Sequence, residues 1–185
     1  MTVALVLGGA RSMWADIEAA LSLGEFDGVV GCNDAAAVWP GRIDAAVSLH
    51  VEKWPHWLAR RARSGFPPIG AVIGHLEAQA SQPPVSEGID CYTEFRFEGQ
   101  TTVGSSGLFA LKVALTDLAF DRAVLCGIPM TADPHFNNDE PWSEAAGYRS
   151  GWTEALPHIA KRARSMSGWT SELLGRPDAE WIGGL

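Results

Sequence analysis

His135 lies in a polar loop and is the side chain best suited to acid–base chemistry. It belongs to the stretch Asp133-Pro-His-Phe-Asn137, which follows an apolar run that ends at Gly127. An imidazole titrates near neutral pH, so His135 is a candidate general base or acid. Asp133, two residues earlier, is a second candidate catalytic residue. The alternative is a loop histidine without a role.

A glycine turn near the start of the chain is typical of a phosphate-binding loop. The apolar residues 3–7 lead into Gly8-Gly9-Ala10-Arg11-Ser12, where a helical pattern begins. Backbone N–H groups and the positive end of a helix dipole would then face a ligand, most often a phosphate. Arg11 would add positive charge, and Ser12 is expected to cap the helix. Tight turns of this kind also occur where nothing binds.

Two further hydroxyl groups precede the clearest amphipathic pattern. The motif Gly104-Ser-Ser-Gly107 stands directly before residues 108–120. An ordinary helix cap needs one serine, whereas Ser105, Ser106 and Gly107 together predict an anion or ribose site.

Polar residues follow the apolar runs that we interpret as strands. The runs cover about residues 3–7, 29–32, 45–49, 71–74 and 123–127. Asn33 and Asp34 follow the second run, and His50 follows the third. Ligands of open parallel sheets bind beyond the carboxyl ends of the strands, so we expect these side chains to line one cleft.

Two histidines are each followed by a glutamate two residues later. The pairs are His50 with Glu52 and His75 with Glu77. This spacing is unspecific and predicts no third ligand, so we assign no metal site. We expect His50 to hydrogen-bond backbone or ligand at the rim of the cleft.

The alternation of apolar runs and helical patterns predicts one Rossmann-like α/β domain over residues 1–185. Because the strands are continuously apolar, we expect a mostly parallel sheet with helices on both faces. Helices are expected at 51–63, kinked or restarted at Pro55, and at 108–120, with Lys112 facing outward. A helical segment is expected over about 143–166, interrupted at Gly151 and Pro157.

Three smaller patterns complete this prediction. Residues 91–97 alternate and predict a half-exposed strand near a sheet edge, after a connection over 77–88. The first helix is expected to bury one face and to stop at Gly24; that face comprises Met13, Ile17, Ala20 and Leu21. Several of the eight tryptophans, Trp142 among them, lie near expected loops, where they pack the core or form a wall for a ring-shaped ligand.

Composition excludes several classes of protein. Fourteen Lys and Arg against 22 Asp and Glu give a net charge of −8, which disfavours nucleic-acid binding. The basic clusters 60–63 and 161–164 are interpreted as solvated helix ends. Three cysteines predict no disulfide framework, and no run predicts a signal peptide or a membrane span. We expect a cytoplasmic protein, with a homo-oligomer as a possibility.

The order of the motifs resembles that of a known superfamily. It comprises a glycine loop, the pair Cys32-Asn33, Ser-Ser-Gly at 105–107, a strand ending in Gly127 and a loop with a histidine. This order is similar to the Rossmann-like superfamily that joins bacterial CMP-sialic-acid-dependent sialyltransferases to MptE-like 6-hydroxymethylpterin diphosphokinases. The resemblance covers about residues 3–140. Within this superfamily, the chain also resembles small proteins of phages and prophages, in the motifs Asn33-Asp-Ala35 and Leu49-His-Val-Glu52.

The resemblance implies a nucleotide site and a catalytic base. In the sialyltransferases the glycine loop, the strand-end Asn and the Ser-Gly step hold the cytidine nucleotide, and a loop histidine activates the acceptor hydroxyl. These roles would fall on Gly8–Ser12, Asn33, Ser105–Gly107 and His135. The chain departs from the family in its glycine loop, which is often Gly-x-Gly-Pro-Ser, and in Pro129, where the family commonly has Asp.

Three hypotheses about function follow. The first is a nucleotide- or nucleotide-sugar-binding protein with glycosyltransferase-like activity, whose only implied ligand is the donor itself. The second is a pyrophosphokinase that holds Mg²⁺ through Asp34, Asp133 or Asp139, although the absence of the family's Asp weakens it. The third is a non-catalytic binding or interaction module of a phage or prophage.

Overall fold

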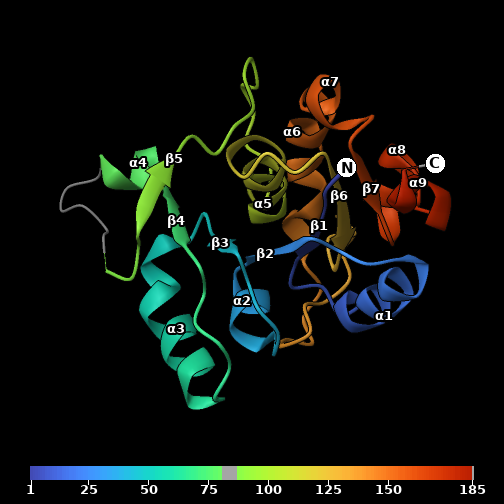
Figure 1. Ribbon diagram of the computed structural model, residues 1–185. Coiled ribbons are helices and arrows are strands. Elements are labelled where there is room, and N and C mark those ends of the chain that lie inside the picture. Colours follow the sequence, from blue (N-terminus) through green and yellow to red (C-terminus); the bar gives the residue numbers. More distant parts are fainter. Residues whose placement is uncertain (81–86, 185) are drawn as a thin grey trace.

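A parallel sheet forms the centre of the molecule (Figure 1). The computed structural model describes residues 1–80 and 87–184. Within these ranges the strands are β1 (Val3–Leu7), β2 (Gly28–Cys32), β3 (Ala45–Val47), β4 (Val72–His75), β5 (Cys91–Thr93), β6 (Arg122–Cys126) and β7 (Ala163–Ser165). They form one sheet in the order β5-β4-β3-β2-β1-β6-β7, and each neighbouring pair is parallel. The Rossmann-like α/β fold is therefore confirmed.

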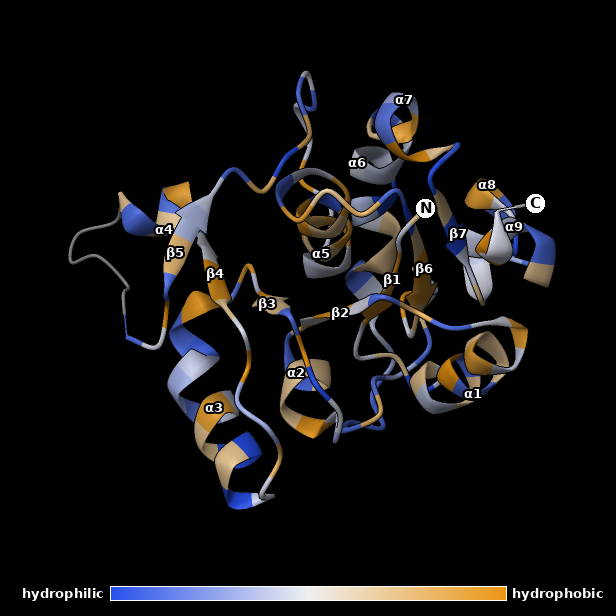
Figure 2. Cartoon of the chain, in the orientation of Figure 1, coloured by the Kyte–Doolittle hydropathy of each residue, from blue (hydrophilic) through white to orange (hydrophobic). Residues whose placement is uncertain are grey.

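Helices cover both faces of the sheet. On one face lie α1 (Met13–Leu23), α2 (Asp34–Val38) and α3 (Trp54–Arg63); on the other lie α5 (Ser106–Lys112), α6 (Arg149–Glu154) and α7 (Leu156–Ile159) (Figure 1). The shorter elements are η1 (Val51–Lys53), α4 (Leu76–Gln79), η2 (Val113–Asp117), η3 (Ser143–Tyr148), α8 (Gly168–Leu174) and α9 (Ala179–Gly183). Figure 2 shows hydrophobic residues along β6 and α5, as two-sided burial requires.

The order of the strands reverses beside β1. From β1 the chain adds strands outward to β5 on one side and then returns to add β6 and β7 on the other. The loops that leave β1 and β6 therefore diverge to opposite sides of the sheet. A crevice forms at such a switch point, beyond the carboxyl ends of the two strands.

Two glycines allow the ends of β1 and β6 to approach closely. A Cβ atom on Gly8 would lie 2.6 Å from the carbonyl oxygen of Gly127, and one on Gly127 would lie 2.5 Å from that of Gly8. Gly127 also has a φ of +70°, which L-residues with side chains rarely adopt. The N–H groups of Gly8 and Ala10 donate to the carbonyl oxygens of Cys126 (2.9 Å) and Gly127 (3.0 Å). The two strand ends are thus locked together.

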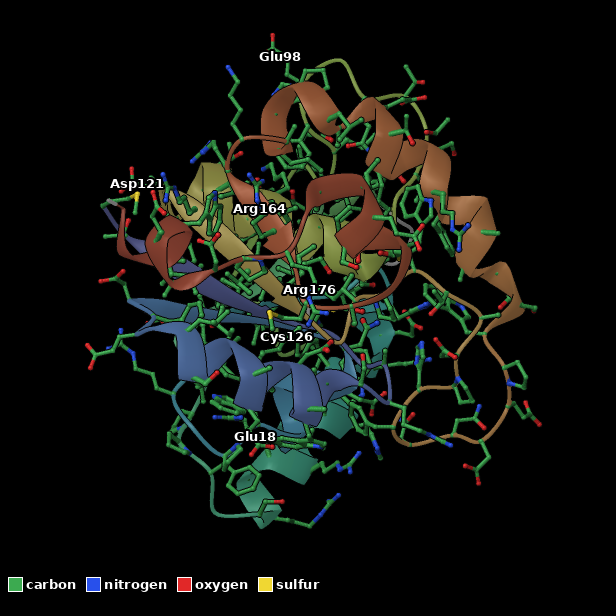
Figure 3. The ribbon with its side chains drawn as sticks, turned by 90° about the vertical axis from the view of Figure 1, so that its right-hand side faces the viewer. Glu18, Glu98, Asp121, Cys126, Arg164 and Arg176 are labelled. Carbon is green, nitrogen blue, oxygen red and sulfur yellow. The ribbon has the colours of Figure 1, made fainter. Side chains whose placement is uncertain are left out.

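The C-terminal part of the chain differs from the prediction. The expected helical segment ends at α7, and the basic cluster 161–164 continues into β7, a strand at the edge of the sheet. Ala163 and Ser165 are buried, while Arg164 projects outward and its guanidinium lies over the ring of Trp181 at 5.1 Å (Figure 3). Charged side chains are typical of edge strands, and a short alternating run reveals such a strand poorly.

The predicted helix 108–120 is also altered. It begins at Ser106, and after Lys112 it widens into the π-helix η2, which turns Leu118 toward solvent. Lys112 is buried, not outward, because its ammonium donates to Thr93 Oγ1 (3.0 Å) and to the carboxylate of Asp117 (2.8 Å). The hydrogen bond to Thr93 joins α5 to the edge strand β5, and the ion pair with Asp117 joins it to η2.

Smaller differences concern three other segments. Leu21 is exposed, although the other expected face residues of α1 are buried. Only Cys91–Thr93 of the run 91–97 pairs with the sheet, at the expected edge, while Phe95 and Phe97 are buried beyond it. The expected connection 77–88 begins inside the short helix α4 (Leu76–Gln79), and its residues 81–86 lie outside the described residues. Within the described ranges no helix has the length and hydrophobicity needed to cross a membrane.

Gly127→Ala should destabilise the fold by about 2–5 kcal/mol, since it adds both an unfavourable φ and an overpacked contact. Urea denaturation measures this change. Gly65→Ala is the matched control, because Gly65 has a φ of +69° and a methyl group there would meet no heavy atom of the described residues within 4 Å. Equal destabilisation by the two substitutions would contradict the importance of the close approach.

Candidate functional site

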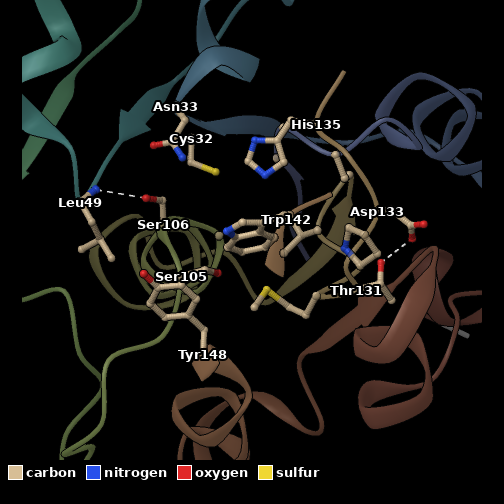
Figure 4. Close-up of a pocket in the computed structure, with 18 of the residues that line it drawn as sticks. Cys32, Asn33, Leu49, Ser105, Ser106, Thr131, Asp133, His135, Trp142 and Tyr148 are labelled. Atoms are coloured by element: carbon tan, nitrogen blue, oxygen red, sulfur yellow. Dashed lines mark hydrogen bonds between the residues drawn. The ribbon is translucent and has the colours of Figure 1, made fainter. Parts of the chain in front are cut away.

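A cavity of about 170 Å³ opens at the switch point, between the loops after β1 and β6 and the start of α5 (Figure 4). The structure brings most of the predicted site residues together there. They are Gly8, Gly9, Ala10, Asn33, His50, Ser105, Ser106, Gly107, Asp133 and His135. Five segments far apart in the sequence therefore contribute to one pocket.

Arg11, Ser12 and Asp34 do not line this pocket. Arg11 forms an exposed ion pair with Asp139 and borders a separate pocket of about 260 Å³. The carboxylate of Asp34 accepts a hydrogen bond from Trp57 Nε1 (3.0 Å) and lies 3.6 Å from the guanidinium of Arg60. The charges of Arg11 and Asp34 are therefore already paired with charged side chains of the protein.

Ser12 does not cap α1 with its side chain, contrary to the prediction. Its hydroxyl donates instead to the carboxylate of Asp16 (3.0 Å), one turn along the helix. The same carboxylate oxygen accepts from the N–H of Gly127 (2.9 Å) and from the hydroxyl of Ser167 (2.7 Å). Asp16 thus joins α1 to the end of β6 and to the C-terminal segment.

The glycine loop is mostly closed to a phosphate, which differs from our expectation. The N–H groups of Gly8 and Ala10 are bonded to the end of β6, and that of Arg11 donates to the carbonyl oxygen of Pro134 (3.1 Å). The N–H groups of Gly9 and Ser12 are the two in this loop with no backbone acceptor in the described chain. The loop instead positions the His135 segment: Ala10 bridges to His135, and Phe136 N–H donates to the carbonyl oxygen of Gly9 (3.0 Å).

The start of α5 supplies the donors that the glycine loop lacks. The first N–H groups of a helix have no intrahelical acceptor, and those of Ser106 and Gly107 find none elsewhere among the described residues. The hydroxyl of Ser106 accepts from the N–H of Leu49 (3.1 Å), which leaves its proton to donate. The hydroxyl of Ser105 is buried without a partner in the part of the chain described.

Asn33 is held in an unusual conformation at the end of β2. Its φ is +53°, and its side-chain carbonyl accepts a hydrogen bond from the hydroxyl of Ser48 (2.6 Å). Ser48 is fixed in turn because its oxygen accepts from the N–H of His50 (2.8 Å). The carboxamide therefore offers its NH₂ group to the pocket. Ser48 was missed at the level of sequence, because it lies inside a strand-end run and has no distinctive motif.

His135 is half-buried and packs edge-to-face against Trp142, with 5.3 Å between the ring centroids. Burial lowers the pKa of its imidazole below 6.5, and the charge of Asp34 offsets part of this effect. Neither ring nitrogen has a hydrogen-bond partner among the residues described. The lowered pKa favours the neutral imidazole, and its ring nitrogens are free to accept a proton.

Aromatic and apolar side chains form the opposite wall. Trp142 stacks on Tyr148 at 5.9 Å, and Ile128 and Met130 complete the surface. Trp142 thus lies at the pocket, one of the two places considered for it. Cys32 also lines the pocket, but burial, with a contribution from Asp34, raises its pKa to about 12, so it is a poor nucleophile.

Neither of the two His-x-Glu pairs belongs to a candidate metal centre in the described part of the chain. His50 lies 3.8 Å from Glu52 at an exposed position, and His75 Nδ1 accepts from the N–H of Ala78 (3.2 Å) to cap α4. Across the described residues, no three His, Cys, Asp or Glu side chains are grouped so as to hold a metal ion.

Comparison of the chain with models of protein families, with curated proteins and with solved structures finds no match. A function must therefore be argued from the chemistry of the pocket, because a fold alone does not define one.

The imidazole of His135 should titrate below pH 6.5 in the folded protein. NMR of the histidine Cε1–H resonances measures this, with the signal assigned by its loss in His135→Asn. Because the unfolded chain binds the proton more readily, the contribution to stability is lost as pH falls from about 6.5 through the folded pKa. A midpoint above 6.5 would contradict the burial of this ring.

Proposed function

We propose that the pocket binds a nucleotide or nucleotide-sugar and that the protein transfers the sugar to an acceptor hydroxyl. One observation carries this proposal: His135 lines the same cavity as Asn33 and the Ser105–Gly107 donors, at the switch point of the sheet. Ligands of open α/β sheets bind at this place. The motif order, which resembles that of sialyltransferases, agrees with the same assignment.

The charges of the pocket favour a donor with a single phosphate. Neither Lys nor Arg lines it, and Asp133 is its one carboxylate among the described residues. Hydrogen-bond donors and a helix start offset about half an elementary charge, which suits one phosphodiester better than a diphosphate. Cytidine 5′-monophosphate (CMP) and its sugar esters are therefore the probes we favour.

His135 would act as the general base. Its neutral imidazole would take the proton of the acceptor hydroxyl while that oxygen bonds to the anomeric carbon of the sugar. The bond between that carbon and the phosphate oxygen breaks, and the nucleoside monophosphate leaves with the electron pair. A positioned base of this kind contributes about 10²–10⁴-fold to the rate.

CMP should raise Tm by several degrees, and Asn33→Ala should abolish the shift because the pocket loses its carboxamide donor. Differential scanning fluorimetry with a nucleotide panel measures this, with and without Mg²⁺. Asn137→Ala is the control, since Asn137 is exposed and does not line the pocket. No shift with any nucleotide at millimolar concentration would contradict the proposal, and a strict need for Mg²⁺ would favour the pyrophosphokinase hypothesis.

His135→Asn should slow transfer from a CMP-sugar by about 10²-fold or more while CMP binding is retained. Release of CMP in the presence of sugar acceptors, followed by chromatography, measures the rate. His56→Asn is the matched control, because His56 is exposed on α3. Binding of CMP without turnover of any donor, and equal behaviour of the two variants, would favour the non-catalytic module.

A further inference from the structure

The turn after β6 directs three consecutive carbonyl groups away from the pocket. Thr170 donates from its hydroxyl to the carbonyl oxygen of Ile128 (2.6 Å) and from its N–H to that of Pro129 (3.3 Å). Arg149 donates to the carbonyl oxygen of Met130 from Nε (3.0 Å) and Nη2 (2.8 Å). Neither Thr170 nor Arg149 lines the pocket, so these carbonyls face its outer side.

The N–H groups of the same peptide units point the other way. In a trans peptide the C=O and N–H bonds are antiparallel. The N–H of Met130 therefore opposes the carbonyl of Pro129, and the N–H of Thr131 opposes that of Met130. Both Met130 and Thr131 line the pocket, and neither N–H has an acceptor within the described chain. Successive N–H groups arranged in this way form an anion-binding nest.

A buried hydroxyl that lines the same cavity also lacks a partner. Ser105 is only 8% exposed, and its Oγ makes no hydrogen bond to any described residue. A buried hydroxyl without a partner costs free energy, which a ligand oxygen would recover. Met130 adds a φ of +51°, a conformation that the hydrogen bonds of Arg149 hold in place. The unsatisfied donors and the held turn meet in one pocket.

We propose that the N–H groups of Met130 and Thr131, with the hydroxyl of Ser105, bind a phosphoryl oxygen, and that Arg149 positions the Met130–Thr131 peptide, which carries the second of these N–H groups. The inference deepens the proposed function, on which it rests, by locating the phosphate subsite away from the glycine loop. Arg149 is itself fixed, because its guanidinium lies 5.0 Å from the ring centroid of Trp169. Its positive charge stays behind the Met130 peptide and polarises it without entering the pocket.

Inorganic phosphate tests this subsite without any nucleoside. Titration of the ¹⁵N-labelled protein should shift the amide resonances of Met130 and Thr131 saturably. Arg149→Met should weaken phosphate binding about tenfold or more, because the Met130 peptide loses its two fixed hydrogen bonds. Ser105→Ala should weaken binding without moving the Met130 peptide, and it keeps the site testable if Arg149→Met fails to fold.

Arg164→Met is the matched control. Arg164 also donates to backbone carbonyls, of Ala160 (2.9 Å) and Ala163 (2.8 Å), and also lies over a tryptophan ring, but it is outside the pocket. Its loss should leave phosphate binding unchanged. Absence of shifts at Met130 and Thr131 would overturn the subsite, and equal affinity in Arg149→Met would overturn the role of Arg149.

The outcomes separate this inference from the proposed function. Phosphate binding at Met130 and Thr131 with no response to any nucleotide would support the subsite and contradict nucleotide binding. CMP binding with no contribution from these amides would support nucleotide binding and contradict the subsite. Acetate, titrated in parallel, should bind more weakly; tighter binding of acetate would overturn the assignment to a phosphoryl oxygen.

Discussion

The close approach of Gly8 and Gly127 is the constraint on which the pocket depends. The ends of β1 and β6 lie side by side at the switch point, and the turn after β1 donates backbone hydrogen bonds to the end of β6 with no room for side chains. Because Gly127 adopts a positive φ, the chain leaves β6 in the direction that brings Pro129 and Met130 to the pocket. Asp16 strengthens the same junction by accepting from the N–H of Gly127.

Because of this junction, the segments whose N–H groups could bind an anion have different roles. The glycine loop uses its N–H groups to hold β6 and the His135 segment, so it serves mainly as a support. The start of α5 and the turn at Met130 keep N–H groups without acceptors among the described residues, and both line the pocket. No Lys or Arg of the described chain lines this pocket, but oriented peptide dipoles can stabilise an anion there. Because these dipoles are already fixed, they reorganise little when the anion binds.

Much of the fold could be predicted because the strands are short, apolar and separated by helical patterns. The run at residues 3–7 matches β1, and the polar residues after the strands converge because parallel strands end at one edge. Features that depend on distant contacts could not be predicted in this way. Nothing local to Ser48 or Arg149 shows that each orients a pocket residue, and the alternation in β7 is only three residues long.

The wrong predictions have related physical causes. Lys112 was expected outward because lysines favour solvent, yet Asp117 and Thr93 satisfy its ammonium in a buried position. Ser12 has the residue type of a cap, but the carboxylate of Asp16 competes for its hydroxyl. The hydrogen bonds of the glycine loop depend on strand β6, which is distant in the sequence, and no pattern within the loop can reveal them.

A crystal structure of the complex with CMP would show directly where the nucleotide and its phosphate bind. We expect electron density for the nucleotide in the pocket, with Asn33 donating to the nucleoside and a phosphate oxygen within hydrogen-bond distance of the Met130 and Thr131 N–H groups. His135 would face the open side of the phosphate. Density for CMP at the Arg11 pocket, or a phosphate bound by the glycine-loop N–H groups, would contradict this arrangement.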